Sequence, residues 1–246
     1  MNPLRVLWQW IVRGYLRIID PIADWMVARR INPNTITTVG TLCSVAGGII
    51  YASGHIMTAG WVLGLTALFD VLDGTVARRT GRSTTFGAFY DSTLDRVADG
   101  AVLGGLTYFY ATNAIHRNSV MVIVCLAGLM GAFLTSYTRA RAESLGIDAK
   151  VGMLQRPERV TLLSAPQAFF GLLFNGYVLM GIVVLLTVTS LITAMQRIAF
   201  VYRATTPGNS AGAAPRAPAS PSAAPSAADE RRPYARAAAS PVLKGE

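Results

Sequence analysis

Apolar residues fill the middle of the chain in long runs that short polar connections separate. A helix that crosses a bilayer needs about 20 mostly apolar residues, and six segments approach that length. The pattern predicts six membrane-spanning helices, at roughly residues 35–53, 57–79, 86–110, 119–142, 158–174 and 176–200. We therefore expect an all-α integral membrane protein, because helices satisfy their own backbone hydrogen bonds in lipid.

The two ends of the chain differ from this apolar middle. Residues 3–30 mix arginines with tryptophan, tyrosine and aliphatic residues, which is typical of an amphipathic helix at a membrane surface. Asp20-Pro21 is expected to break or kink that helix. After residue 203 the sequence is mainly Ala, Pro and Ser, which cannot bury enough apolar surface to fold. The predicted organisation is an interfacial helix (1–34), a six-helix transmembrane domain (35–203) and a disordered tail (204–246).

Charge is scarce and unevenly placed. Only 14% of the residues are charged, yet the formal net charge is +9. Between Arg30 and Arg203, basic residues fall almost wholly around 78–82, around 139–159 and near the end of the last predicted span. This asymmetry follows the positive-inside rule. We therefore expect a multi-pass protein of the plasma membrane, with both termini and the candidate active site described below on the cytoplasmic side. Anionic lipids and anionic substrates account for the basic charge, so no nucleic-acid partner is expected.

Carboxylates gather in one stretch, FDVLDGTVARRTGRSTTFGAFYDSTLDRVADG (69–100). It holds five of the 13 acidic residues, namely Asp70, Asp73, Asp91, Asp95 and Asp99. Asp70 and Asp73 are three residues apart, and Asp91 and Asp95 are four apart, so each pair shares one helix face. The two helices are consecutive and joined by a short connection. They are predicted to pack antiparallel, with these four carboxylates converging near the cytoplasmic boundary.

Such a group of carboxylates needs an explanation. An ionised aspartate costs about 2.5–3.5 kcal/mol near the middle of a membrane helix, and neighbouring carboxylates repel one another. Sets of carboxylate oxygens suit hard divalent ions such as Mg²⁺ or Mn²⁺, which is the interpretation that we favour. The spacing alone leaves two others open. The carboxylates could form salt bridges with Arg78, Arg79, Arg82 and Arg96, or they could line a pathway for protons or cations.

Small residues accompany the carboxylates. Gly74 follows Asp73, Ala77 comes one turn later, and Gly87 stands one turn before Asp91. Gly inside a helix costs up to about 1 kcal/mol relative to Ala. A helix face of Asp, Gly and Ala leaves a groove beside the carboxylates where a ligand can lie, although each glycine taken singly could serve helix packing.

The run Asp70-x2-Asp73-Gly74-x2-Ala77-Arg78-x8-Gly87-x3-Asp91-x3-Asp95 resembles the signature of the CDP-alcohol phosphatidyltransferase family. All eight signature residues match at the expected spacing, and the resemblance extends over about residues 1–203. It implies a six-helix membrane enzyme, usually a homodimer. Such enzymes transfer a phosphatidyl group from CDP-diacylglycerol to an alcohol and release CMP.

The resemblance also implies roles for individual residues. The metal ligands would be Asp70, Asp73, Asp91 and Asp95, which hold two divalent ions, Mg²⁺ or Mn²⁺. Asp95 would also act as the general base. The contacts with CDP-diacylglycerol would be Gly74, Ala77, Arg78 and Gly87.

A second basic set concerns the acceptor alcohol. Arg139, Arg159 and Arg197 stand at the expected cytoplasmic ends of three different spans, where three guanidinium groups could bind a phosphate monoester. This part of the chain is similar to actinobacterial phosphatidylinositol-phosphate synthases of that family. The similarity lies in Ser136-Tyr137, Arg156-Pro157-Glu158-Arg159, Gln196-Arg197 and the early Asp20-Pro21. It implies that the three arginines hold the acceptor's phosphate, and we predict inositol 1-phosphate as the acceptor.

Two other functions remain as alternatives. The same chemistry with glycerol 3-phosphate would give phosphatidylglycerophosphate. A cation transporter could also use carboxylates within the membrane. The acidic residues cluster near one surface, however, and no matching pair of broken helices occurs in the other half of the chain, which disfavours transport.

Overall fold

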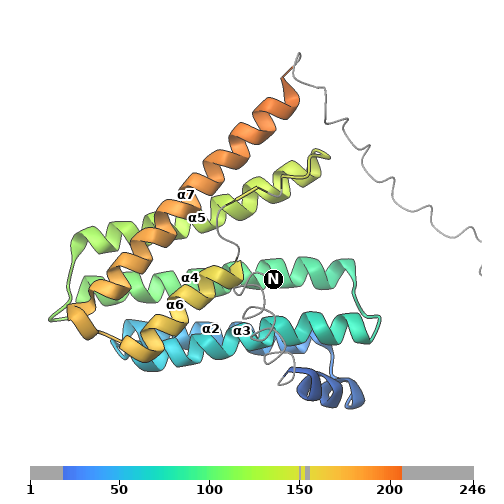
Figure 1. Cartoon of the computed structure of the whole chain (residues 1–246), viewed down its shortest axis with the longest axis horizontal. Coiled ribbons are helices and arrows are strands. Elements are labelled where there is room, and N and C mark those ends of the chain that lie inside the picture. Colours follow the sequence, from blue (N-terminus) through green and yellow to red (C-terminus); the bar gives the residue numbers. More distant parts are fainter. Residues whose placement is uncertain (1–18, 150, 153–155, 207–246) are drawn as a thin grey trace, which may run out of the picture.

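A computed structural model describes residues 19–149, 151–152 and 156–206 (Figure 1). Within these ranges every regular element is helical, as expected. The elements are a helical segment at residues 19–28, α2 (Pro33–Ala52), α3 (Ile56–Arg79), α4 (Thr85–Thr112), α5 (Ser119–Ser144), α6 (Arg156–Phe170), the short 3-10 helix η1 (Leu173–Gly176) and α7 (Tyr177–Thr205). The predicted tail and the first 18 residues of the predicted interfacial helix lie almost wholly outside the described residues.

Local sequence signals place the ends of these helices. Asn32, Thr84 and Asn118 precede α2, α4 and α5, and their side chains accept hydrogen bonds from backbone N–H groups of the first turn. Gly54 and Gly81 follow α2 and α3 with φ of 84° and 66°, a left-handed conformation that glycine adopts without strain. The ends of these helices are therefore determined by residues that are close to one another in the sequence.

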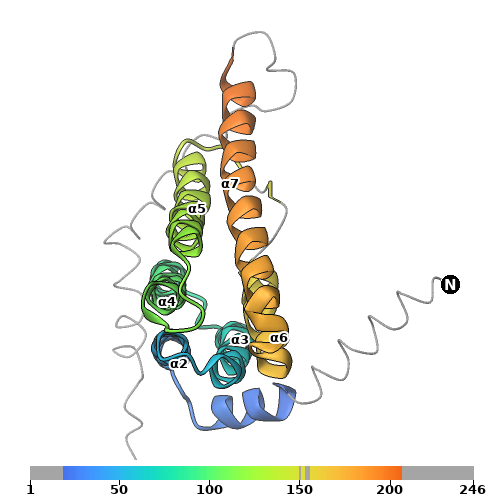
Figure 2. The same ribbon diagram turned by 90° about the vertical axis from the view of Figure 1, so that its left-hand side faces the viewer.

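The helices run back and forth along one axis (Figure 1). The connections α2–α3, α4–α5 and α6–α7 lie at one end of the bundle, and the α3–α4 connection and residues 19–28 lie at the other. Helix α2 packs against α3 and α4, α6 packs against α3 and α7, and α5 packs against α4 and α7. Figure 2 shows α4 between α2 and α5, with α6 beside α3 and α7. Each helix from α2 to α7 thus packs mainly against two others, and together they form a ring.

The segment at residues 19–28 is docked on the bundle. Ile19 and Ala23 are fully buried, in a cluster with Ile36 of α2 and with Leu72 and Val76 of α3. The opposite face carries charge, and its aspartates, Asp20 and Asp24, form ion pairs with Arg79 at the end of α3. This part of the predicted interfacial helix is therefore held by the protein itself. The helix includes Pro21, and the residues that would reveal a kink before it lie outside the described ranges.

Four helical runs are long and apolar enough to cross a membrane within the part of the chain that the structure describes. They are α2, α3, α5 and the run Leu173–Thr205, which contains α7. Helix α4 matches the expected third span and has 28 residues, but its aspartates lower the hydropathy. Helix α6, at the expected fifth span, has 15 residues and contains Pro166. At 1.5 Å per residue it is about 22 Å long, shorter than the hydrocarbon thickness of about 30 Å.

Glycine permits the closest helix crossings. A Cβ at Gly105 of α4 would lie 2.0 Å from the carbonyl oxygen of Gly48 in α2. A Cβ at Gly60 of α3 would lie 2.4 Å from the backbone nitrogen of Ala168 in α6. No side chain fits at these positions, so the glycines let the backbones approach each other.

Candidate active site

Most of the signature residues line one groove, formed by α2, α3, the α3–α4 connection and α4. Its volume is about 210 Å³. The six signature residues in its wall are Asp73, Gly74, Ala77, Arg78, Gly87 and Asp91. The first turns of α2 complete the wall with Asn34 and Thr37, which sequence reasoning did not identify. The predicted groove beside the carboxylates is therefore present.

The two signature glycines shape this groove. A Cβ at Gly74 would lie 3.2 Å from Nη1 of Arg78, and one at Gly87 would lie 3.4 Å from Oδ1 of Asn34. The missing side chains let the Arg78 guanidinium lie beside Gly74 and let α2 approach the first turn of α4. Arg78 also donates a 3.2 Å hydrogen bond from Nη2 to the Thr75 hydroxyl. Its charged group thus lies in the wall of the groove.

Asp73 is the most deeply buried carboxylate of the set, with only 8% of the residue exposed. The Thr37 hydroxyl donates a 2.7 Å hydrogen bond to Asp73 Oδ2. Asp91 and Asp70 lie close enough for their negative charges to act on Asp73. The hydrogen bond and the surrounding protein therefore hold the Asp73 carboxylate in place, although the negative charges of Asp70 and Asp91 repel it.

The donor set fits a hard divalent cation. In the described ranges neither Asp73 nor Asp91 forms an ion pair with a basic side chain. In those same ranges, no three carboxylate, imidazole or thiol groups come together closely enough to make a metal site by themselves. The oxygen ligands are of the right type, and their mutual repulsion is what a bound cation would offset.

The other two predicted ligands lie beyond the groove lining. Asp70 faces α2, where a Cβ at Gly40 would be 4.0 Å from Asp70 Oδ1. Asp95 stands one turn after Asp91 on α4, and its Oδ2 lies 3.6 Å from Nη2 of Arg96. The structure thus brings Asp73 and Asp91 to the groove and leaves the full convergence of four carboxylates unformed. Salt bridging, the alternative interpretation, applies to Asp95 but not to the two groove aspartates.

The three arginines assigned to the acceptor come together although they belong to α5, α6 and α7. Arg139 and Arg159 both lie close enough to Arg197 for their positive charges to act on it. Glu143 is the acidic group that acts on Arg197 in the opposite sense. Neighbouring cations repel, so such a cluster is favourable where an anion binds between them. Arg139 and Arg159 therefore both lie near Arg197, while the phosphate-binding role of the three arginines stays a prediction.

Two of these arginines are held by contacts with the protein. Arg197 Nε donates a 2.9 Å hydrogen bond to the carbonyl of Val151, and Nη1 donates to the carbonyl of Thr135. Arg139 Nε donates a 2.9 Å hydrogen bond to Glu143 Oε1, one turn further along α5. These contacts limit the rotamers of both side chains before any ligand arrives.

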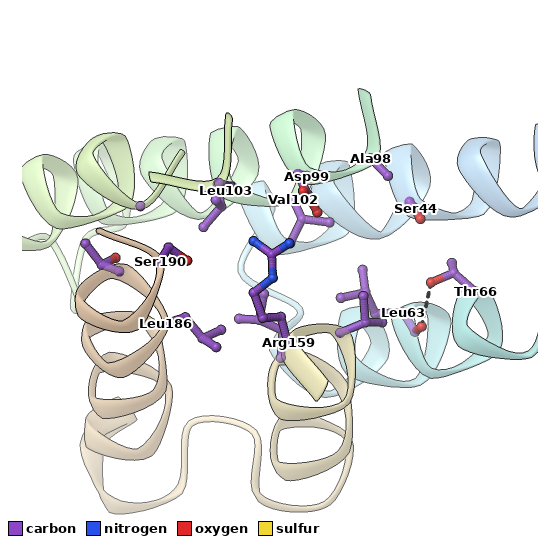
Figure 3. Close-up of a pocket in the computed structure, with 15 residues that line it drawn as sticks. Ser44, Leu63, Thr66, Ala98, Asp99, Val102, Leu103, Arg159, Leu186 and Ser190 are labelled. Carbon is purple, nitrogen blue, oxygen red and sulfur yellow. Dashed lines mark hydrogen bonds between the residues drawn. The ribbon is translucent and has the colours of Figure 1, made fainter. Parts of the chain in front are cut away.

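The third arginine enters a cavity inside the bundle (Figure 3). This cavity has a volume of about 50 Å³ and takes lining residues from every helix from α2 to α7. Its charged lining residues are Arg159 and Asp99, and the rest are apolar, small or hydroxyl-bearing. Figure 3 shows the Arg159 guanidinium extending from α6 toward the Asp99 carboxylate on α4. Sequence reasoning gave Asp99 no role, although its spacing of four from Asp95 places both on one face.

The acidic face of α4 connects the groove with this cavity. Asp91, Asp95 and Asp99 repeat every four residues and therefore follow one side of the helix. Asp91 lines the groove and Asp99 lines the cavity that contains Arg159. Asp95 lies between these two positions along the helix. Asp95, the predicted base, thus lies along α4 between the groove and the cavity that Arg159 enters.

Comparisons with known proteins agree with the signature. The sequence model described as CDP-alcohol phosphatidyltransferase matches residues 30–205. The phosphatidylinositol phosphate synthase of Streptomyces avermitilis is 36% identical over 212 residues, covering 82% of this chain and 85% of that protein. The archaetidylinositol phosphate synthase of Methanothermobacter thermautotrophicus is 37% identical over 187 residues, covering 76% and 90%.

Solved structures give the same result. The crystal structure of Mycobacterium tuberculosis phosphatidylinositol phosphate synthase with CDP-DAG bound has a TM-score of 0.69 and 36% identity, covering 80% of this chain and 99% of that chain. The same enzyme in complex with manganese and citrate has a TM-score of 0.69 and 35% identity, covering 80% and 93%. The match to the family extends over most of the chain and includes the helices that carry the groove. The chain therefore belongs to the CDP-alcohol phosphatidyltransferase family.

Proposed function

We propose that the protein transfers a phosphatidyl group from CDP-diacylglycerol to inositol 1-phosphate, producing phosphatidylinositol phosphate and CMP. The observation that carries this proposal is the gathering of Arg139 and Arg159 around Arg197, with Arg159 lining the same cavity as Asp99 of α4. A cluster of three guanidinium groups suits an acceptor that has its own phosphate, in contrast to a neutral alcohol. The names of the relatives support the same acceptor.

The donor is assigned to the groove. Gly74, Ala77 and Gly87 leave space there for the flat cytosine base and its ribose, and Arg78 offers a cation to the pyrophosphate. The acyl chains would extend from the groove into lipid. Asn34 and Thr37 add polar groups on the α2 side. The structure of the M. tuberculosis relative with CDP-DAG bound supports this assignment.

Two divalent ions, Mg²⁺ or Mn²⁺, are assigned to Asp70, Asp73, Asp91 and Asp95. When bound, they would neutralise the pyrophosphate and stabilise the charge that develops during transfer. The M. tuberculosis complex with manganese supports the type of ion. The role of Thr37 is to hold the Asp73 carboxylate in one orientation through its hydrogen bond.

The reaction then depends on Asp95. The carboxylate takes the proton from the acceptor hydroxyl, and the freed oxygen forms a bond with the phosphorus of the phosphatidyl group. The bond from that phosphorus to the CMP oxygen breaks, and CMP leaves with the electron pair. Nη2 of Arg96 lies 3.6 Å from Oδ2 of Asp95. The three arginines orient the acceptor for in-line attack.

We also propose the membrane arrangement expected for the family. Helices α4 and α6 would complete six spans, since each joins connections at opposite ends of the bundle (Figure 1). The groove, the arginine cluster and both termini would face the cytoplasm at the plasma membrane. The functional unit would be a homodimer, as is usual in the family.

The experiment that tests this function measures CMP release from CDP-diacylglycerol with inositol 1-phosphate, glycerol 3-phosphate and free inositol in turn. We expect turnover to be fastest with inositol 1-phosphate. Free inositol serving equally well would contradict the assignment of the arginine cluster. Glycerol 3-phosphate as the best acceptor would leave that cluster intact but refute the choice of inositol. Absence of CMP release with all three would refute the proposed function.

A further inference from the structure

Asp99 is the one aspartate of the acidic stretch that the family signature does not use. It lies on α4 one turn after Asp95, and its side chain is 16% exposed. Its Oδ2 atom is buried and accepts no hydrogen bond from the residues that the structure describes. The Arg96 Nε atom is 3.8 Å away, which is too long for a hydrogen bond. A buried carboxylate in this position is costly unless a second cation or water satisfies it.

That second cation stands across the internal cavity. The guanidinium of Arg159 extends from α6 toward Asp99, and these two residues are the charged members of the lining (Figure 3). The hydroxyl-bearing lining residues include Ser44, Thr66 and Ser190. The lining is otherwise mostly apolar, but the cavity of about 50 Å³ has room for a few water molecules, which can bridge the two charges.

We propose that Asp99 is a positioning residue for the acceptor, and that it acts by orienting the Arg159 guanidinium. The proposal rests on the proposed function, because it takes Arg159 as a ligand of the acceptor's phosphate. Arg197 is oriented by two backbone carbonyls and Arg139 by Glu143. Asp99 provides the corresponding anchor for the third arginine, on the opposite helix wall.

The negative charge of Asp99 would also reduce the repulsion within the arginine cluster. Arg159 and Arg139 each repel Arg197 when no anion is bound. A carboxylate beside Arg159 offsets part of this repulsion and reduces the number of rotamers that the long side chain samples. The free site is then already arranged for a phosphate. Binding loses less entropy when the cations are oriented in advance.

A direct contact between Asp99 and the acceptor is less compatible with the cavity. Its volume of about 50 Å³ suits water, whereas a polyol ring would need several times that space. Action through Arg159 predicts that the loss of Asp99 weakens every phosphate ligand alike. Direct contact with a ring hydroxyl predicts a loss that depends on the rest of the acceptor. Binding of inorganic phosphate, which has no ring, therefore distinguishes action through Arg159 from direct contact with the acceptor.

The test compares the wild type with Asp99→Asn in the full-length protein. The measured quantities are the KM for inositol 1-phosphate, the KM for CDP-diacylglycerol, kcat, and the inhibition constant of inorganic phosphate against the acceptor. We expect the acceptor KM and the phosphate inhibition constant to rise together by about 10-fold, the effect of one charge-assisted contact. The KM for CDP-diacylglycerol and kcat should change much less. An unchanged inhibition constant for phosphate would overturn the proposal.

A double-mutant comparison isolates the route through Arg159. If Asp99 acts by orienting that guanidinium, adding Asp99→Asn to Arg159→Ala should raise the acceptor KM no further. A second full increase would show that Asp99 acts elsewhere and would overturn the proposal. Ser44→Ala is the matched control, because it alters the same cavity without removing charge, and its acceptor KM should equal that of the wild type.

Asp99→Glu keeps the test decisive if the asparagine variant does not fold. It retains the charge but displaces the carboxylate, so the acceptor KM should rise by less than in Asp99→Asn, with the KM for CDP-diacylglycerol unchanged. Unaltered acceptor and phosphate constants in a folded Asp99→Glu protein would contradict the proposal. Failure of the proposed function is distinguishable from these outcomes, because it would appear as absent CMP release in the wild type itself.

Discussion

The hydroxyl of Thr37 in α2 donates a 2.7 Å hydrogen bond to Asp73 Oδ2 in α3, and both residues are 92% buried or more. This bond connects the first span to the carboxylate that lies deepest in the groove. Thr37 also lies within reach of the Pro33 carbonyl at 3.2 Å, so its position on the helix is well defined. The bond therefore joins the packing of two helices to the geometry of the proposed metal site.

Replacing Thr37 with valine should weaken metal use while keeping the side-chain shape. The buried Asp73 oxygen would lose its donor, which costs about 1–3 kcal/mol. We expect a higher Mg²⁺ or Mn²⁺ concentration for half-maximal CMP release. Thr41→Val is the matched control, since among the described residues the Thr41 hydroxyl donates to the Thr37 carbonyl of its own helix, at 2.9 Å, and to no carboxylate. Equal metal dependence in the two variants would refute the role of Thr37.

The groove aspartates should be indispensable. Asp73→Asn and Asp91→Asn each remove a ligand charge, so turnover should fall to background and excess Mg²⁺ should restore little of it. EDTA should stop the wild type, and added Mg²⁺ or Mn²⁺ should restore it. Asp24→Asn serves as the control, because Asp24 is an exposed partner of Arg79 outside the groove. Turnover that resists EDTA would exclude the metal mechanism.

Arg139 and Arg141 allow a comparison within one helix. Arg139 belongs to the arginine cluster, whereas Arg141 lies within 3.4 Å of the Ser144 hydroxyl at the exposed end of α5. We expect Arg139→Ala to raise the acceptor KM by about 10-fold, the value of one charge-assisted hydrogen bond of about 1.5 kcal/mol. Arg141→Ala should leave it unchanged. Titration of inositol 1-phosphate against both variants measures the difference, and equal KM values would remove Arg139 from the acceptor site.

Adjacent glycines of α4 should differ sharply in their tolerance of alanine. A Cβ at Gly105 would lie 2.0 Å from the Gly48 carbonyl oxygen, whereas one at Gly104 would have no atom within 4 Å. Gly105→Ala should therefore push α2 and α4 apart and destabilise the protein by about 1–3 kcal/mol, the usual cost of overpacking. Gly104→Ala should be neutral. Thermal unfolding in detergent compares the two, and similar midpoints would contradict this account of the crossing.

Much of the helical layout was predictable from sequence because it depends on short-range patterns. Apolar runs located α2 to α7 to within a few residues, and the structure shows side-chain caps at Asn32, Thr84 and Asn118 where three of these helices begin. The spacing of the signature residues likewise placed Asp73 and Asp91 beside one groove, but the predicted packing of α3 against α4 was wrong, because both helices pack against α2 instead. Contacts within about four residues determine these features, so they require no knowledge of the fold.

Hydropathy alone did not settle how many helices cross the membrane. The aspartates of α4 and the 15-residue length of α6 leave four runs that meet the length and apolarity criterion among the described residues. The positions that break the apolar pattern, Asp91, Asp95 and Asp99, are those to which we assign chemistry. Membrane insertion favours apolar residues, whereas the proposed chemistry needs carboxylates at these positions. A hydropathy criterion therefore misses α4.

Residue chemistry and spacing in the sequence determined the family, the acidic pairs and the three arginines. Only the tertiary structure decided which of these residues meet. Thr37 and Asp73 are 36 positions apart, and Asp99 faces Arg159 from a different helix. Such partners are brought together by helix packing at crossings like that of Gly48 with Gly105, where the absence of a side chain sets the distance. The sequence pattern carries no information about that distance. The contact of Thr37 with Asp73 and the placement of Asp99 opposite Arg159 therefore became visible only in the fold.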